Sequence, residues 1–129
     1  MLPFTVRLKP GLPAYEQILY AVKKSVVTGQ LRPGDDFPSV RTISQELRIN
    51  PNTAHKVVAV LEADGLLEVR PGVGTVVARI APATREQRRQ LLNGDLERLV
   101  VDAKTLRLEI EEVFDAVRSH WTRLTKGKG

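Results

Sequence analysis

The side chains best suited to chemistry lie in one short stretch, 50–56, which carries amide, hydroxyl, imidazole and ammonium groups. An asparagine amide can form two hydrogen bonds with an adenine edge, and a threonine can contact a thymine methyl or a phosphate. A lysine neutralises a phosphate or reaches a guanine. The members of this set are Asn50, Asn52, Thr53, His55 and Lys56. Such a mixture is typical of a surface that contacts base edges in double-stranded DNA.

Local signals place this stretch at the start of a helix. Asn50 followed by Pro51 is typical of an N-cap with proline at the first helical position. Helical spacing of apolar residues continues to a glycine stop at Asp64-Gly65. The residues predicted to face inward are Ala54, Val57, Val58, Leu61 and Leu66.

A shorter helix is predicted just before it, over 40–47, with Ser39 as its cap. The connection 48–50 is very short. Two helices joined by a turn of this length predict a helix-turn-helix, in which the second helix enters the major groove by its N-terminal end. Arg41, in the first turn of the shorter helix, is then placed to reach the DNA backbone or the groove edge.

Two further elements flank this pair. An apolar stripe over 14–28 predicts a helix before it, and the stretch 67–77 predicts a β-hairpin with a glycine-rich tip after it. At that tip Arg70, Gly72 and Gly74 could bring an arginine and close backbone to a minor groove. The predicted fold is mainly α with a small β-hairpin wing, in the order of a winged helix-turn-helix. A plain hairpin turn, a helix cap and a solvated helix face are the structural alternatives for these residues.

The stretch from Thr84 to Thr125 lacks proline and has glycine only at Gly94. Apolar residues there recur four and three positions apart, the spacing of a seam between packed helices. Together with the aromatic residues Phe114 and Trp121, these residues are Leu92, Leu96, Leu99, Ala103, Leu106, Ile110, Val113 and Val117. We expect them to form a homodimer interface. The unbroken spacing is typical of one long helix, with a candidate kink at Asn93-Gly94.

Length and composition limit the domain organisation, the partner and the location of the protein. The 129 residues fit a winged-helix domain over 1–80 and a helical dimerisation region over 81–129. The net charge of +5 favours a polyanionic partner. With no cysteine and no apolar stretch approaching the roughly 20 residues of a membrane span, we expect a cytoplasmic protein with no membrane partner.

Catalysis has little support in the sequence. Two histidines, His55 and His120, stand far apart, so neither a Ser-His-Asp arrangement nor a multi-histidine metal site is indicated. The acidic residues 109–115 are typical of a solvated helix side. We therefore expect no enzyme activity, no cofactor and no metal.

Residues 13–78 resemble the GntR-type winged-helix transcription regulators. The resemblance rests on G-x-L-x-P-G-D, P-S-x-R, N-P-N-T, L-E-x-D-G-L and G-x-G-T, at 29–35, 38–41, 50–53, 61–66 and 72–75. The short helical tail is similar to that of the YtrA-like branch, which implies a pair of dimerising helices with a turn near 106–109. The resemblance also implies DNA contacts from Arg41, Asn50, Asn52, Thr53, His55 and Gly72.

The sequence thus predicts a transcriptional regulator that binds an inverted-repeat DNA operator as a homodimer, acting as a repressor. The resemblance suggests regulation by a small-molecule or stress input, and the sequence does not identify an effector. The alternative is a winged-helix adaptor for protein or non-specific nucleic-acid binding. Such an adaptor needs basic residues more than amides on its second helix, because phosphate contacts carry little sequence information.

Overall fold

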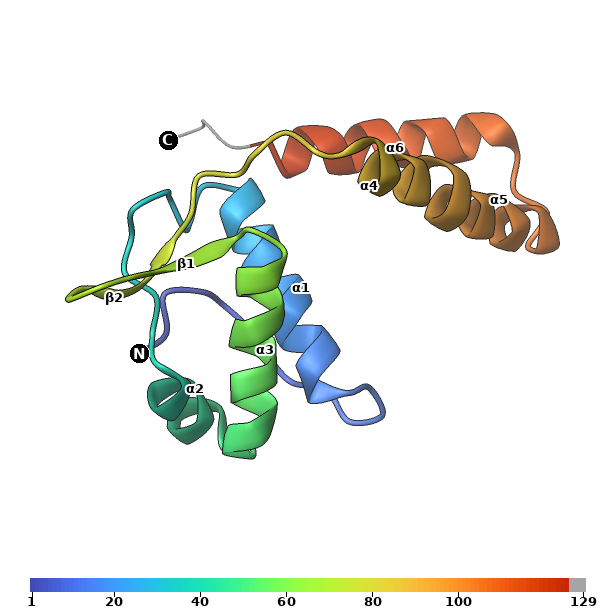
Figure 1. Cartoon of the computed structure of the whole chain (residues 1–129). Coiled ribbons are helices and arrows are strands. Elements are labelled where there is room, and N and C mark those ends of the chain that lie inside the picture. The colour runs from blue at the N-terminus through green and yellow to red at the C-terminus, as the bar shows by residue number, and fades with distance from the viewer. Residues whose placement is uncertain (126–129) are drawn as a thin grey trace. The chain divides into compact units, whose positions relative to one another are not determined.

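The computed structural model describes residues 1–125 and divides into two compact units, Met1–Ile80 and Ala81–Leu124 (Figure 1). The first unit contains three helices followed by a hairpin. The second contains only helices. The last four residues of the predicted region 81–129 lie outside the described residues.

The core of the first unit forms where α3 (Pro51–Ala63) packs against α1 (Ala14–Val27) and α2 (Val40–Leu47). The apolar stripe predicted over 14–28 is confirmed, since Ile18 and Val22 are fully buried there. From the other helices, Ile43, Ala54, Val57 and Leu61 are likewise shielded from solvent. Burial of these faces holds the three helices together, because each helix alone exposes its apolar stripe.

The segment before α1 is part of this core, which the sequence did not indicate. Phe4 is buried and stacks on Phe37, with ring centroids 5.7 Å apart and ring planes 7° from parallel. Closer to α1, the Gln17 side chain accepts from the Lys9 backbone N–H at 2.8 Å and donates to its carbonyl at 2.9 Å. The segment therefore closes the core beside the loop that contains Phe37.

The turn between α2 and α3 has the predicted length and a conformation that the sequence did not predict. Ser39 caps α2, its hydroxyl accepting from the Thr42 N–H at 3.1 Å. Arg48 then adopts a left-handed conformation at φ 54°, and the Ile49 N–H donates back to the Ser44 carbonyl at 3.1 Å. This turn is a helix-turn-helix connection of three residues.

The wing is an antiparallel hairpin of β1 (Leu67–Arg70) and β2 (Gly74–Val77), with Leu67 opposite Val77. An isolated bridge from Asp36 to Val76 places the 34–37 loop along the other edge of β2. Leu67, Val76 and Val77 are buried. The predicted fold class, mainly α with a small β-hairpin wing, is confirmed.

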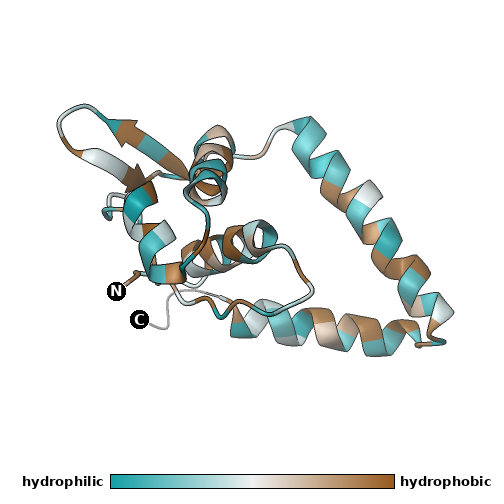
Figure 2. Cartoon of the chain, turned by 90° about the horizontal axis from the view of Figure 1, so that it is seen from below, coloured by the Kyte–Doolittle hydropathy of each residue, from teal (hydrophilic) through white to brown (hydrophobic). Residues whose placement is uncertain are grey.

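The second unit is a continuous helical run over 85–105 followed by α6 (Ile110–Arg123). The run comprises α4 (Arg85–Arg89), a π-helical stretch η1 (Gln90–Asp95) and α5 (Leu96–Thr105). The helical run 85–105 and α6 both carry apolar and polar residues in alternating bands (Figure 2). No hydrophobic residue of this unit is among the buried residues of the described chain. No helix within residues 1–125 is long and apolar enough to cross a bilayer.

The π-helical stretch replaces the kink considered at Asn93-Gly94. The helix continues through it, and the Leu96 N–H donates to the Leu91 carbonyl, five residues back. A turn that spans five residues is wider than an α-helical turn, and it carries the helix through Asn93-Gly94 without a break.

A turn over 106–109 separates the two long helices, so the interpretation of the tail as one helix is wrong. Arg107 adopts a left-handed conformation at φ 61°, and the Leu108 N–H donates to the Ala103 carbonyl at 2.9 Å. Glu109 and Glu112 then form a reciprocal capping box that begins α6. The turn lies where the family resemblance implied it.

We expect Phe4→Ala to lower the free energy of unfolding by about 3–5 kcal/mol, because it removes a buried ring and leaves a cavity beside Phe37. Urea unfolding at one fixed protein concentration measures this change in the free energy of unfolding. Leu12→Ala, at a side chain 60% exposed, is the matched control and should change stability by less than about 0.5 kcal/mol. Equal effects of the two substitutions would contradict a core role for Phe4.

Candidate nucleic-acid interface

The first two turns of α3 present a polar face to solvent. Asn52, His55 and Lys56 are exposed, and Thr53 is half-buried. The exposure of these polar residues follows from the helix geometry, because Ala54 and Val57 occupy the opposite, buried face. The positive end of the helix dipole lies at the same end, where the Asn52 and Thr53 backbone N–H groups bond to Asn50. This face can therefore donate to and accept from a polyanion with exposed base edges.

Asn50 has a structural role that is visible in the structure. Its Oδ1 accepts from the Asn52 N–H at 2.7 Å, which caps α3 as predicted. With Oδ1 engaged in the cap, the Nδ2 group of this exposed amide is available to donate outward. The capping bond also orders the helix start from which Asn52 projects.

Lys56 is held by an aromatic ring from another helix. Its Nζ lies 4.4 Å from the ring centroid of Tyr15, in the first turn of α1. The sequence gave no sign of this pair, since the two residues are far apart in the chain and meet only because α1 packs on α3. From the sequence, Tyr15 is placed only within the apolar stripe predicted over 14–28.

Hydroxyl and guanidinium groups lie at the start of α2. Arg41 is exposed in the first turn, as predicted. The Ser39 hydroxyl, besides capping the helix, donates to the Thr42 hydroxyl at 3.1 Å. From the sequence, Ser39 is predicted only as a cap, and Thr42 is not among the predicted site residues. The Ser-x-x-Thr spacing at a helix start is the signal that could have identified this pair.

The wing carries the remaining predicted residues. Arg70 ends β1, and its Nε donates to the Glu68 Oε2 at 2.8 Å, with both side chains about half exposed. Gly72 and Gly74 have φ of +79° and +113°, and a Cβ built on either would meet no atom within 4 Å. The tip is thus open backbone that an approaching phosphate could reach. The arginine beside it is partly neutralised by Glu68, which is not among the residues predicted from the sequence.

The predicted residues fall into two groups in the structure. The first lies on the helix-turn-helix, and the second lies on the wing, whose tip projects away from the helices (Figure 1). Packing of α2 on α3 and of α3 on β1 fixes both groups within one unit. Within residues 1–125, no group of three or more histidine, aspartate or glutamate side chains is placed to hold a metal ion.

Comparisons with known proteins agree with this geometry. The family model described as "Bacterial regulatory proteins, gntR family" matches residues 14–77. The HTH-type transcriptional repressor YtrA of Bacillus subtilis is 32% identical over 93% of each chain. The chain belongs to the gntR family. Its members are DNA-binding transcription regulators rather than enzymes, and this chain is a transcriptional regulator of that family.

Similarity to individual relatives extends into the second unit. The uncharacterised HTH-type regulator YhcF of Bacillus subtilis is 34% identical over 83% of this chain and 88% of its own. A crystal structure from Listeria monocytogenes EGD-e, described as a transcriptional antiterminator, superposes with a TM-score of 0.83. It is 28% identical and covers 98% of this chain and 95% of its own. This gntR-family chain is thus similar to YtrA-like regulators over both units.

Because Glu68 partly neutralises Arg70, we expect Glu68→Gln to tighten duplex DNA binding by this regulator, by up to about fivefold, the usual limit for an exposed pair. Fluorescence anisotropy over a salt series measures the affinity. Glu97→Gln, the same substitution in the second unit, should leave affinity unchanged. Unchanged or weaker binding by Glu68→Gln would show that the wing arginine does not contact DNA.

Proposed function

We propose that the regulator binds an inverted-repeat operator as a homodimer and represses transcription by keeping polymerase from the promoter. The observation that carries the proposal is the exposed amide-rich face at the N-terminus of α3. The DNA-contacting residues that we propose are Arg41, Asn50, Asn52, Thr53, His55, Lys56, Arg70, Gly72 and Gly74. In a two-fold dimer the half-sites lie about 10 base pairs apart, centre to centre.

The chemistry of α3 favours base contacts over general phosphate binding. Among its exposed N-terminal residues, Asn52 offers an amide, His55 a ring with one donor and one acceptor when neutral, and Lys56 the positive charge. A surface that only neutralises phosphates needs several cations. One cation beside an amide and an imidazole suits a defined base sequence better.

Repression is supported by relatedness. YtrA of Bacillus subtilis, which matches this chain over 93% of its length, is named a transcriptional repressor. A regulator that occupies chromosomal DNA acts in the cytoplasm. We therefore place the protein there, on an operator that overlaps a promoter.

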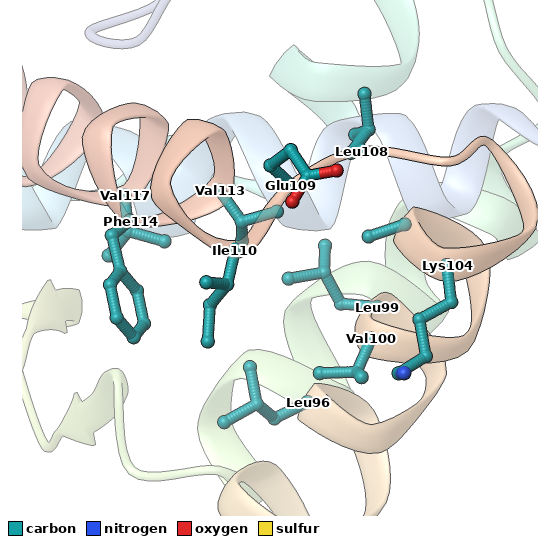
Figure 3. A pocket seen from close by; sticks show the side chains of 11 residues that line it. Leu96, Leu99, Val100, Lys104, Leu108, Glu109, Ile110, Val113, Phe114 and Val117 are labelled. Atoms are coloured by element: carbon teal, nitrogen blue, oxygen red, sulfur yellow. The ribbon is translucent and has the colours of Figure 1, made fainter.

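The second unit supports the homodimer. Leu96, Leu99 and Val100 of α5 face Val113 and Val117 of α6 across a groove of about 550 Å³ (Figure 3). Leu99 and Val117 are nearly half exposed. Two helices cannot bury these faces between themselves, and four helices from two copies can, as in a helix bundle.

We assign the groove to a second copy rather than to a small-molecule effector. Its lining includes both Lys104 and Glu109. A two-fold interface must be complementary to itself, and a surface that carries both signs of charge can pair them across the two-fold axis. Large apolar side chains also remain exposed beyond the groove, among them Leu106 and Trp121, which indicates a covering surface larger than a small molecule.

The proposal is tested first by fluorescence anisotropy on DNA upstream of the regulator's own reading frame, with excess random duplex and a salt series. Saturable binding that survives the competitor supports an operator-binding regulator. Binding that disappears with competitor on this DNA and on fragments selected from the whole genome would contradict it. That result would favour the adaptor alternative.

We expect Asn52→Ala to weaken operator binding by about 1–3 kcal/mol, through loss of a bidentate base contact. The salt dependence of operator binding should not change, because the amide carries no charge. Glu62→Ala, at the C-terminal end of the same helix, is the matched control. Operator affinity equal to that of the unchanged protein would remove Asn52 from the set of base-contacting residues.

We expect Leu99→Glu to convert the dimer to monomers at micromolar concentration, because it places a charge in the apolar groove. Val101→Glu is the matched control on the same helix, since Val101 is 56% exposed and does not line the groove. Sedimentation velocity distinguishes the two species. A dimeric Leu99→Glu variant, or two monomeric variants, would refute this assignment of the interface.

A further inference from the structure

The contact between Lys56 and Tyr15 differs from every other cation contact in the first unit. The ion pairs of the described residues do not include Lys56. Its Nζ instead lies 4.4 Å from the centre of the Tyr15 ring. Tyr15 is half-buried and packs against the hydrophobic core, whereas Lys56 is exposed. A fixed ring thus supports a charge at the edge of the candidate interface.

We propose that Tyr15 is a positioning residue for DNA binding, which holds the Lys56 ammonium where it meets a backbone phosphate beside the bases contacted by Asn52. The proposal rests on the proposed function, since it requires α3 to approach DNA. Tyr15 itself belongs to none of the residues predicted to contact DNA.

The ring suits this task because it attracts the ammonium without neutralising it. A cation over an aromatic face keeps its full charge, and its N–H groups that point away from the ring remain free to donate. A carboxylate partner has the opposite effect, as the Arg70–Glu68 pair on the wing shows. Lys56 is therefore ordered before DNA arrives and remains available to a phosphate.

The rest of the structure fixes the ring. Tyr15 stands in the first turn of α1, and Gln17, two residues further along, bonds the backbone of the preceding segment. Its Nε2 donates to the Lys9 and Leu12 carbonyls at 2.9 Å and 3.0 Å. Lysine has a long flexible stem whose freedom is lost on binding. A ring that already restricts the stem reduces that loss, which is the physical basis of the proposed effect.

The test uses the full chain with Tyr15→Leu, Tyr15→Phe, Lys56→Met and the Tyr15→Leu/Lys56→Met double variant. Affinity is measured on operator DNA and on random duplex over a salt series. We expect Tyr15→Leu to weaken binding about two- to fivefold, and Tyr15→Phe to restore it, since phenylalanine keeps the ring face. Lys56→Met should lower the salt slope by about one. In the Lys56→Met background, Tyr15→Leu should have no further effect.

Tyr20→Leu is the matched control, because Tyr20 lies on the same helix with its side chain 63% exposed. It should bind DNA like the unchanged chain. Thermal unfolding of each variant and titration of the active fraction separate lost folding from lost positioning. A purely structural tyrosine would give the same loss with and without Lys56, which would overturn the proposal. Tighter binding by Tyr15→Leu would also overturn it, by showing that the ring competes with DNA.

The two proposals fail separately. If the unchanged chain shows no competitor-resistant binding to any DNA, the proposed operator function fails. The Tyr15–Lys56 comparison is then decided on random duplex, because a phosphate contact does not depend on sequence. Additive losses on random duplex would overturn the positioning role even where operator binding is intact.

Discussion

The turn at 48–50 fixes the direction in which α3 leaves α2, and the polar face of α3 depends on that direction. Arg48 takes a left-handed conformation that costs an ordinary side chain free energy, and the bonds around it offset that cost. The Ile49 N–H donates to Ser44, and the Asn50 amide caps the next helix at 2.7 Å. A different turn would move Ala54 and Val57 out of the core and rotate Asn52 away from solvent.

Elements with local signals could be predicted from the sequence. Ser39, Asn50-Pro51 and Asp64-Gly65 marked helix ends, because caps and stops act over one turn. The break at 106–109 has a weaker local signal, since its left-handed residue is an arginine rather than a glycine. The Glu109–Glu112 capping box was the evidence available there, and the regular apolar spacing concealed it.

Contacts between distant residues could not be predicted in this way. Phe4 meets Phe37, and Lys56 meets Tyr15, only after the helices have packed. The sequence therefore identified candidate residues by their chemistry and missed what restrains them. The carboxylate beside Arg70 and the ring beside Lys56 give two predicted cations opposite electrostatic environments, although both were expected to serve the same purpose.

The π-helical stretch at Gln90–Asp95 has a consequence for how the tail can vary in length. A turn with one residue more than an α-helical turn accommodates an insertion without breaking the helix. Removal of one residue there would restore regular winding, and the register of Leu96, Leu99 and Ala103 after it would not change. In an alignment, relatives with and without the extra residue would then differ by a single-residue gap at this position. They would still share the same groove-lining residues after it.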